Sequence, residues 1–250
     1  MTDSVAGVVL AAGRGERLRP LTLLRPKALC PVANVPLVDL AIGRVSSHVD
    51  AVAVNVHHHR AALESHLDGR VHCSVEADVP LGTAGALGLL RGWLDGRGAV
   101  VVNADAWCPS GVGPLLEGWD GERIRVLVVG GDRLEDDSLV AGALLPWSEV
   151  AVLRPEPSGL YERSWRVALD EGRLEVVPHD GPFVDCGTPA DYLRANLEAS
   201  GGESVVADGA AVEGELVRSV VWSGAWVRAG EVLVDAIRYD RERTVLVRAR

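Results

Sequence analysis

LAAGRGERLRPLTLLRPKALCPVANVPL, residues 10–37, is the stretch that decides the fold of this chain. The apolar, β-branched run at residues 5–13, VAGVVLAAG, leads directly into it, so a buried strand is expected to end in a glycine-rich loop. Backbone N–H groups in such a loop can face phosphate oxygens. A dinucleotide-binding loop would need a third glycine and a following helix, whereas Leu18 holds that position and Pro20 comes next. The stretch therefore predicts a phosphate-binding loop that does not belong to a nicotinamide or flavin enzyme.

Further apolar, β-branched runs follow this loop and alternate with helical patterns. The predicted strands are 51–56, 71–77, 99–105 and 124–131, and the predicted helices are 36–48, 59–69 and 83–96. This alternation is typical of βαβ units and predicts an α/β fold with a doubly wound, mostly parallel, Rossmann-like sheet. Ligands bind at the carboxyl ends of the strands in such sheets. One rim is therefore expected to carry residues 13–17, 57–59, 78–83 and Asp105.

The pattern changes after about residue 200, where two glycines follow each other. An apolar residue then recurs every six positions, at Val221, Val227, Leu233, Tyr239 and Val245. Such a repeat predicts a short, left-handed parallel β-helix of two or three coils, and a plain β-hairpin appendage is the alternative. We therefore predict a catalytic domain at 1–200 and a hexapeptide-repeat β-helix at 201–250.

So few coils need a cover for their open ends, either from the α/β domain or from another subunit. Trp222 and Trp226 in this tail are candidates for covering an oligomer surface. A homo-oligomer that assembles through the C-terminal β-helix is therefore one expectation.

Composition excludes several classes of protein. With 250 residues and 48% hydrophobic content, the chain can bury a full core, and its formal charge of -10 argues against nucleic-acid binding, which needs clustered cations. No apolar stretch approaches the ~18 residues of a membrane span, and the start lacks the features of a signal peptide. The four cysteines stand singly, so reduced thiols and a cytoplasmic location are expected, with no nucleic-acid or membrane partner.

Residues 10–37 resemble the signature of the sugar-1-phosphate nucleotidyltransferase family, LAAGxGxRLxPLTxxxPKxLxPVxNxPL. The resemblance continues in NVHHH at 55–59, VPLGTAGAL at 79–87, VVNAD at 101–105 and DCGTPADYLRAN at 185–196. It implies an enzyme that joins an NTP and a sugar 1-phosphate, releases pyrophosphate and forms an NDP-sugar. The sequence GTAGAL most resembles the corresponding segment of mannose-1-phosphate guanylyltransferase-like enzymes, so a GDP-mannose-type product is favoured. A catalytically weak, regulatory paralogue that binds nucleotide or nucleotide sugar is the alternative.

The resemblance also implies roles for individual residues. Arg17 and Lys27 would hold the triphosphate and act in catalysis with Asp105, while Asp105 and Asp185 would bind Mg2+. A sugar 1-phosphate is ionised near neutral pH, with a second pKa of about 6, so no general base is required. As alternatives, Asp105 caps a turn and Asp185 opens the helix that follows. The expected nucleotide-binding residues are Leu10, Ala11, Gly13, Gly15, Gly82 and Thr83.

Lys27 is the only lysine among 25 basic residues. An ammonium and a guanidinium are not interchangeable, which favours a functional role over chance placement. The resembling enzymes usually supply a second lysine to the sugar phosphate from an EKP-like segment, which this chain lacks. Either Arg133 or Arg154 replaces that cation, or the sugar-phosphate site is incomplete. The run His57–His59 is not expected to bind a metal, because consecutive residues point in different directions.

Overall fold

The computed structural model describes residues 5–247, which form two compact units, each built from separate stretches of sequence. Within the described range, the first unit comprises residues 5–13, 38–104 and 108–183, and the second comprises residues 14–37, 105–107 and 184–247. Most of the signature stretch and the whole C-terminal tail therefore belong to one unit. None of the helices between residues 5 and 247 is long and apolar enough to cross a membrane.

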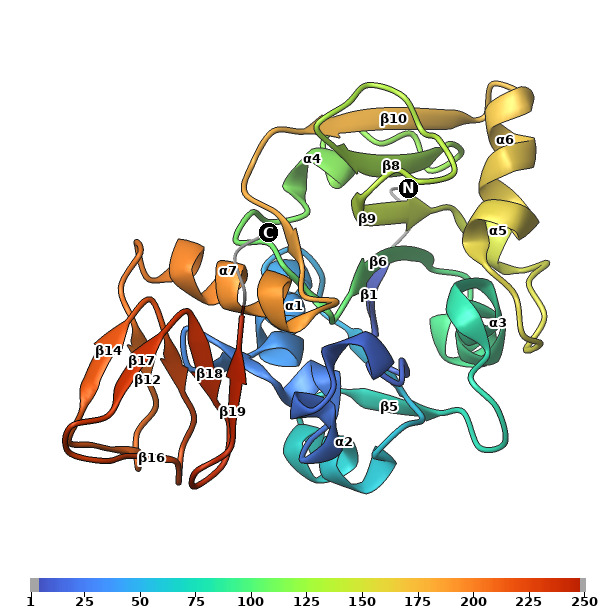
Figure 1. Ribbon diagram of the computed structural model, residues 1–250. Coiled ribbons are helices and arrows are strands. Elements are labelled where there is room, and N and C mark those ends of the chain that lie inside the picture. Colours follow the sequence, from blue (N-terminus) through green and yellow to red (C-terminus); the bar gives the residue numbers. More distant parts are fainter. Residues whose placement is uncertain (1–4, 248–250) are drawn as a thin grey trace. The chain divides into compact units, whose positions relative to one another are not determined.

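A seven-stranded sheet in the order β10-β8-β9-β6-β1-β4-β5 forms the centre of the first unit (Figure 1). Its strands are β1 (Val5–Leu10), β4 (Val52–Val56), β5 (His72–Val75), β6 (Gly98–Asn103), β8 (Ile124–Val129), β9 (Val140–Leu145) and β10 (Leu174–His179). Strands β6, β1, β4 and β5 run parallel, and so do β8 and β10. Strand β9 is antiparallel to both of its neighbours. The predicted α/β class and mostly parallel sheet are confirmed, whereas β9 was not predicted.

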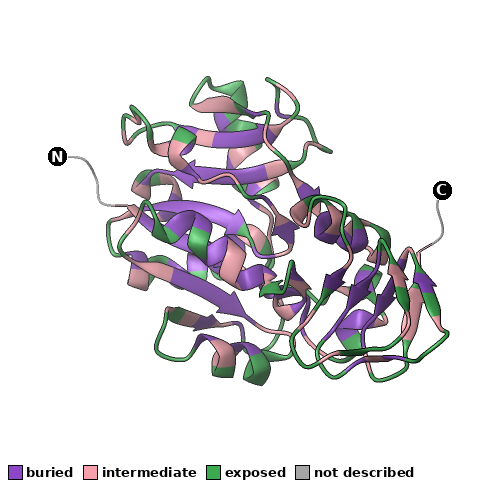
Figure 2. Cartoon of the chain, turned by 90° about the vertical axis from the view of Figure 1, so that its left-hand side faces the viewer, coloured by how far each residue is buried: buried purple, intermediate pink, exposed green. Residues whose placement is uncertain are grey.

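Helices pack on both faces of this sheet, as successive residues of β1 show. Ala6 and Val8 belong to a core shared with α3 (Gly82–Leu94), while a Cβ added at Gly7 would lie 3.0 Å from Val45 of α1 (Leu37–Ser46). The central strands are buried almost throughout, which explains their continuous apolar sequences (Figure 2). The remaining helices of this unit are α2 (Arg60–Leu67), α4 (Gly113–Leu116), α5 (Trp147–Val150), the π-helical turn Tyr161–Trp165 and α6 (Arg166–Asp170).

The carboxyl ends of the parallel strands β1, β4, β5 and β6 lie at one edge of the sheet. Residues 11–13 leave β1 at this edge, 57–59 leave β4, and 76–81 connect β5 to α3. This is the arrangement expected for the loops of the first unit that the sequence predicts to bind ligand.

The second unit begins with the signature stretch, which folds as short turns and a small hairpin. Its elements before the tail are the 3-10 turns Glu16–Leu18, Leu21–Leu23 and Lys27–Leu29, the strands β2 (Pro31–Val32), β3 (Val35–Pro36), β7 (Ala106–Trp107) and β11 (Val184–Asp185), and the helix α7 (Pro189–Ala199). Strand β2 pairs with β3, and β7 pairs with β11, both in antiparallel fashion.

The tail consists of short strands that pair in parallel with strands further along the chain. They are β12 (Val205–Val206), β13 (Ala211–Val212), β14 (Glu215–Val217), β15 (Val220–Val221), β16 (Trp226–Val227), β17 (Val232–Val234), β18 (Ala236–Arg238) and β19 (Thr244–Leu246). Strands β12, β15 and β18 form one parallel row, β13 pairs with β16, and β14 pairs with β17. Strand β19 reverses and pairs antiparallel with β18. A plain hairpin therefore does not describe β12 to β18, because its neighbouring strands would be antiparallel.

The six-residue repeat supplies the core of the tail. Val221, Val227 and Leu233 are buried and pack together with Ala225 and Ala236. Each of these side chains points inward from a different short strand or from the turn between two strands. The spacing observed in the sequence thus corresponds to buried positions as far as Tyr239, whereas Val245, on the reversed strand β19, is only half-buried.

Trp222 joins the tail to the signature stretch. Its side chain is 1% exposed, and its Nε1 donates to the Tyr192 hydroxyl at 2.9 Å. That hydroxyl in turn donates to the carbonyl oxygen of Pro31. The guanidinium carbon of Arg25 lies 4.1 Å from the centroid of the Trp222 ring, in cation-π contact. The suggestion that Trp222 covers an oligomer surface is therefore wrong, because its own chain buries it.

Candidate active site

The glycine-rich loop folds back on the turn that carries Lys27. Gly15 has a φ of 62°, and a Cβ added there would lie 2.9 Å from the Thr22 side chain and 3.0 Å from Cβ of Lys27. The Thr22 hydroxyl donates to the Gly15 carbonyl oxygen at 2.9 Å. Both the left-handed backbone and the close approach require glycine at this position. The loop thus brings residues 15 and 27 together.

Four charged side chains of the second unit meet beside this loop. Lys27 Nζ donates to Asp105 Oδ2 at 2.7 Å and to Asp185 Oδ1 at 3.5 Å. Arg17 Nη2 donates to the other oxygen of Asp185, also at 3.5 Å. The Lys27 side chain is 8% exposed, whereas those of Asp105, Asp185 and Arg17 are 44%, 37% and 71% exposed. A buried ammonium therefore anchors two carboxylates that remain open to solvent, and the sequence predicted all four residues.

Two paired strands explain why the carboxylates lie side by side. Asp185 ends β11 and stands opposite Ala106 of β7, so it is next to Asp105, which directly precedes β7. The backbone N–H of Cys186 also donates to the Asp105 carbonyl oxygen at 3.0 Å. Thr188, rather than Asp185, caps α7 by accepting a bond from the backbone N–H at its third residue. The helix-opening alternative for Asp185 is therefore excluded.

The donor set fits a magnesium ion that keeps much of its own shell. Asp105 and Asp185 both reach one ammonium, so both can face one cation. Mg2+ typically takes one or two carboxylates together with waters and substrate phosphates. Among residues 5–247, no group of three or more His, Cys, Asp or Glu side chains is placed to hold a metal. A Mg2+ ion here would take its remaining ligands from waters or from phosphate oxygens of a substrate.

The buried thiols beside this cluster are poor nucleophiles. Burial raises the pKa of Cys30 to about 12, although Arg25 and Lys27 act in the opposite direction. Burial likewise raises the pKa of Cys186 to about 12. A thiol with such a pKa stays protonated near neutral pH, and only the thiolate attacks. These two thiols are therefore not expected to act as nucleophiles.

The first unit holds most of the residues predicted to bind the nucleotide. Gly13 and Gly82 are exposed, Leu10 and Thr83 are half-buried, and Ala11 is buried. These residues lie on two segments, one at the end of β1 and just after it, and one at the start of α3. Gly15, the sixth predicted residue, belongs to the second unit.

Two buried polar side chains connect these segments of the first unit, and the sequence had not singled them out. The backbone N–H of Ala11 donates to Asn55 Oδ1 at 2.6 Å, and Asn55 Nδ2 donates to Glu76 Oε1 at 2.7 Å. The other carboxylate oxygen, Glu76 Oε2, accepts from the backbone N–H of Leu81 at 2.7 Å. The available signal was Asn55 within the otherwise apolar pattern AVAVNV and Glu76 near the end of the predicted strand VHCSVEA.

A row of glycines on α3 fixes a further segment, residues 154–160, against this helix. A Cβ at Gly82, Gly85 or Gly88 would collide with the backbone of residues 158, 156 and 154, respectively. The backbone N–H of Leu160 also donates to the hydroxyl of Thr83 at 2.8 Å. The three-residue spacing of these glycines places them on one helix face. The glycines of GTAGALG are therefore required for packing, in addition to the role toward a ligand that the sequence predicts.

The two arginines expected at the sugar phosphate differ in their surroundings. Arg154 is exposed on the segment packed against α3, where it lines a surface hollow of about 220 Å³ together with Glu156, Ser158 and Arg163. Arg133 is exposed in the loop that follows β8. Only Arg154 thus stands on a segment hydrogen-bonded to Thr83, and the role of either residue remains a prediction.

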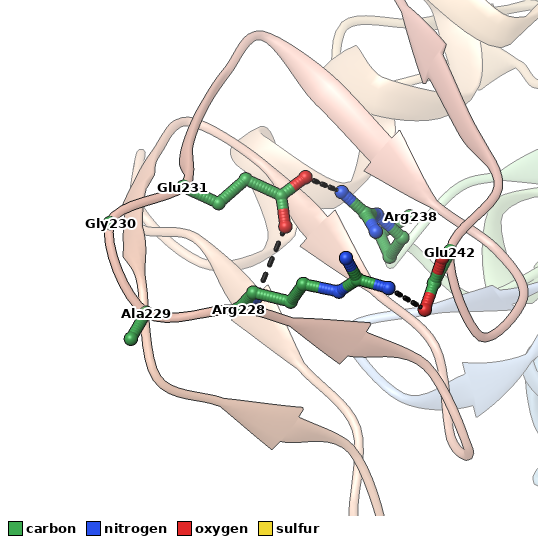
Figure 3. Close-up of a pocket in the computed structure, with 6 residues that line it drawn as sticks. All are labelled: Arg228, Ala229, Gly230, Glu231, Arg238 and Glu242. Carbon is green, nitrogen blue, oxygen red and sulfur yellow. Dashed lines mark hydrogen bonds and ion pairs between the residues drawn. The ribbon is translucent and has the colours of Figure 1, made fainter.

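A larger hollow lies on the tail, as Figure 3 shows. It measures about 380 Å³ and is lined by Arg228, Ala229, Gly230, Glu231, Arg238 and Glu242. Arg228 pairs with Glu242, and Arg238 pairs with Glu231. Because each arginine is neutralised by a glutamate, this hollow offers little net positive charge to a phosphate.

Known proteins resemble this chain in sequence and in fold. A family model described as Nucleotidyl transferase matches residues 6–133. Mannose-1-phosphate guanylyltransferase of Mycobacterium tuberculosis is 28% identical, covering 97% of this chain and 82% of that protein. N-acetylmuramate alpha-1-phosphate uridylyltransferase of Caulobacter vibrioides is 32% identical, with coverages of 75% and 94%. A crystal structure described as mannose-1-phosphate geranyltransferase from Thermus thermophilus has the same fold, with a TM-score of 0.71 at 16% identity over 97% of this chain and 95% of that one.

Proposed function

Since this chain belongs to the sugar-1-phosphate nucleotidyltransferase family, we propose that it transfers a nucleoside monophosphate from an NTP to a sugar 1-phosphate. An oxygen of the sugar phosphate forms a bond to the α-phosphorus of the NTP. Pyrophosphate then leaves with the electron pair of the broken P–O bond, and the product is an NDP-sugar. A guanylyltransferase and a uridylyltransferase, both named for a sugar 1-phosphate, are among the relatives and support this reaction class.

The observation that carries the proposal is the convergence of Lys27, Asp105 and Asp185, with Arg17 at the edge of the group. The attacking phosphate is already ionised, so the protein has to position the reactants and neutralise charge. The Lys27 ammonium would stabilise negative charge on the leaving pyrophosphate, and the Arg17 guanidinium would offer a fork of N–H donors to the triphosphate. The proposed roles thus follow from charges that the structure brings to one place.

Mg2+ is the cofactor that we propose, with Asp105 and Asp185 as its protein ligands. When bound, such an ion neutralises phosphate charge as a Lewis acid. This proposal is supported by the two partly solvent-exposed carboxylates, because both face the Lys27 ammonium and could therefore face a single metal ion. Lys27 would hold both carboxylates in place before any metal arrives.

Guanine and mannose are the base and sugar that we favour. The relatives named for mannose 1-phosphate and guanylyl transfer in Mycobacterium tuberculosis and Sulfolobus acidocaldarius support this preference, while the relative from Caulobacter vibrioides is named for other substrates. For the sugar-phosphate cation we favour Arg154 over Arg133, since Arg154 lies on the segment bonded to Thr83. A cytoplasmic location is proposed as well, supported by four cysteines that are all unpaired.

A substrate panel tests the proposed reaction. Purified protein with Mg2+ is given each common NTP with the 1-phosphates of mannose, glucose, N-acetylglucosamine and N-acetylmuramic acid, and pyrophosphate release is measured. GTP with mannose 1-phosphate is expected to react fastest, and another preferred pair would correct the specificity alone. No release from any pair, together with measurable nucleotide binding, would instead support a regulatory paralogue that binds nucleotide without turnover.

We also propose that the parallel strands of the tail form a short left-handed β-helix through which two copies of the chain associate. The support is an exposed apolar face on the paired strands β14 and β17. Val217, Val232 and Val234 are 40%, 53% and 47% exposed there, while Leu233 between them points inward and is 5% exposed. A second copy of the same chain would cover such a face.

Light scattering coupled to size-exclusion chromatography tests this association. Val232→Asp is expected to convert a dimer into a monomer, because it would bury a charge at the interface. Val152→Asp provides the matched control, since Val152 is 72% exposed and lies in the first unit. A wild-type protein that stays monomeric at micromolar concentration, or a Val232→Asp variant that stays dimeric, would exclude this interface.

A further inference from the structure

Asn55 and Glu76 are among the most deeply buried polar residues of the first unit, with 3% and 2% exposure. Asn55 lies in β4, between β1 and β5, and Glu76 directly follows β5. Neither side chain belongs to the proposed charge cluster, which consists of Arg17, Lys27, Asp105 and Asp185. Buried polar groups are costly unless each donor and acceptor is satisfied, so their hydrogen bonds indicate what they do.

Their side chains form a continuous chain of hydrogen bonds between two backbone segments. It begins at the N–H of Ala11, passes through the Asn55 amide and the Glu76 carboxylate, and ends at the N–H of Leu81, over distances of 2.6, 2.7 and 2.7 Å. Ala11 directly follows β1, and Leu81 directly precedes α3. This series of hydrogen bonds therefore connects the two segments that are proposed to bind the nucleotide.

Glu76 is itself fixed by its backbone. Its N–H donates to the carbonyl oxygen of Val56 at 3.0 Å, and its own carbonyl oxygen lies 2.7 Å from Nδ1 of His57. A carbonyl oxygen only accepts, so the proton of this bond sits on Nδ1 of His57. The carboxylate also lies at the amino end of α3, where the helix dipole favours a negative charge. Glu76 is thus held in place from both its backbone and its side chain.

We infer that Asn55 and Glu76 are positioning residues that set the spacing of the nucleotide-binding segments, and thereby the affinity for the NTP. This inference rests on the proposed function, because it takes residues 10–13 and 82–83 as the nucleotide site. Neither residue needs to touch the ligand. Each acts through a backbone N–H at the start of a segment that does.

The direction of the hydrogen bonds makes the inference testable by substitution. Glu76 must accept at both oxygens, whereas a glutamine accepts at one end and donates at the other. In Glu76→Gln, a donor therefore faces either the N–H of Leu81 or Nδ2 of Asn55. If the Asn55 amide is rotated so that its oxygen faces the new glutamine, its Nδ2 faces the N–H of Ala11, and two donors again oppose each other. One buried donor stays unpaired in every arrangement.

The double variant Asn55→Asp with Glu76→Gln restores a complete set of bonds. The aspartate would accept from Ala11 at one oxygen and from the new glutamine at the other, and the glutamine oxygen would accept from Leu81. The negative charge moves from position 76 to position 55, and the shape is retained. Asn55→Asp alone would instead set two carboxylates against each other.

Steady-state kinetics and direct binding of Mg-GTP by equilibrium dialysis provide the test. Each single variant is expected to raise both the KM for the NTP and the Kd for Mg-GTP by about tenfold or more, as loss of a buried hydrogen bond predicts. The KM for the sugar 1-phosphate should change by less than about twofold. The double variant should return to within about threefold of wild type, since the two sites are coupled.

Several results would overturn the inference. Folded single variants with unchanged Mg-GTP affinity would do so, as would an equal rise in both KM values, which would indicate general loosening of the core. A double variant no better than the single variants would also contradict it. If the wild-type protein binds Mg-GTP but releases no pyrophosphate, the proposed reaction fails while the binding comparison still decides this inference.

Discussion

Replacement of Lys27 by alanine is expected to lower the rate of pyrophosphate release by at least ~10^2-fold, the usual effect of removing a group that stabilises transition-state charge. Lys27 bonds both carboxylates of the site, and its side chain is 8% exposed. Its loss would remove a positive charge from the leaving pyrophosphate and leave two carboxylates to repel each other. Quench-flow or coupled pyrophosphate assays at saturating substrates would measure the change in kcat.

A control for Lys27→Ala must remove an ion-paired cation of the second unit without touching this cluster. Arg218 meets this requirement, because it pairs with Asp235 in the tail and is 52% exposed. Arg218→Ala should keep its rate within about twofold of wild type, as expected for an exposed ion pair. Methylammonium added to Lys27→Ala should restore part of the rate if the charge itself is what matters. A normal rate in folded Lys27→Ala would refute its catalytic role.

Asp105→Asn is expected to lower turnover by a similar factor, at least ~10^2-fold, together with a higher Mg2+ requirement. The asparagine oxygen can still accept the bond from Lys27, so the shape of the cluster is retained and only charge is lost. Rates measured over a range of Mg2+ concentrations, and binding of Mn2+ followed by its paramagnetic signal, would separate metal affinity from catalysis. Chelation of the metal should abolish activity of the wild type.

The exposed Asp208 of the tail provides a matched control for this substitution. Asp208→Asn makes the same chemical change away from the cluster and should have no effect on the metal requirement. If Asp105→Asn responds to Mg2+ as the wild type does, Asp105 is not a metal ligand. Near-normal rates in both Lys27→Ala and Asp105→Asn would leave the fold standing and move the active site elsewhere.

The sheet was predictable where its strands are buried on both faces, because such strands have continuous apolar sequences. The runs at β1, β4, β6 and β8 carry this signal, and all four are strands. The predicted β5 is a strand as well, but it lies at the edge of the sheet and its residues, HCSV, are only partly buried. Strand β9 has a similar apolar sequence, but nothing local encodes that it runs antiparallel between β8 and β6. Strand direction depends on the connections at each end, which are a property of the whole fold.

The charge cluster was predictable from the family resemblance, because each of its four residues falls within a recognisable motif. The link between Asn55 and Glu76 was not, since neither residue forms a motif and their partners are backbone N–H groups. A buried polar residue in an apolar strand pattern shows that a partner must exist, but only the fold identifies it. The packing of residues 154–158 against the α3 glycines could not be predicted from the sequence for the same reason.

The contact of Trp222 with Arg25 and Tyr192 has a consequence for how the protein is made. The loop that carries Arg17 and Lys27 leaves the ribosome well before Trp222, which contacts Arg25 and bonds to Tyr192. Chains are synthesised at roughly 5–20 residues per second, and early segments usually begin to fold first. Here the loop that carries Arg17 and Lys27 has to wait for Trp222 before these contacts can form. A chain interrupted before residue 222 would therefore contain every residue of the proposed catalytic cluster and still lack the packing that holds its loop.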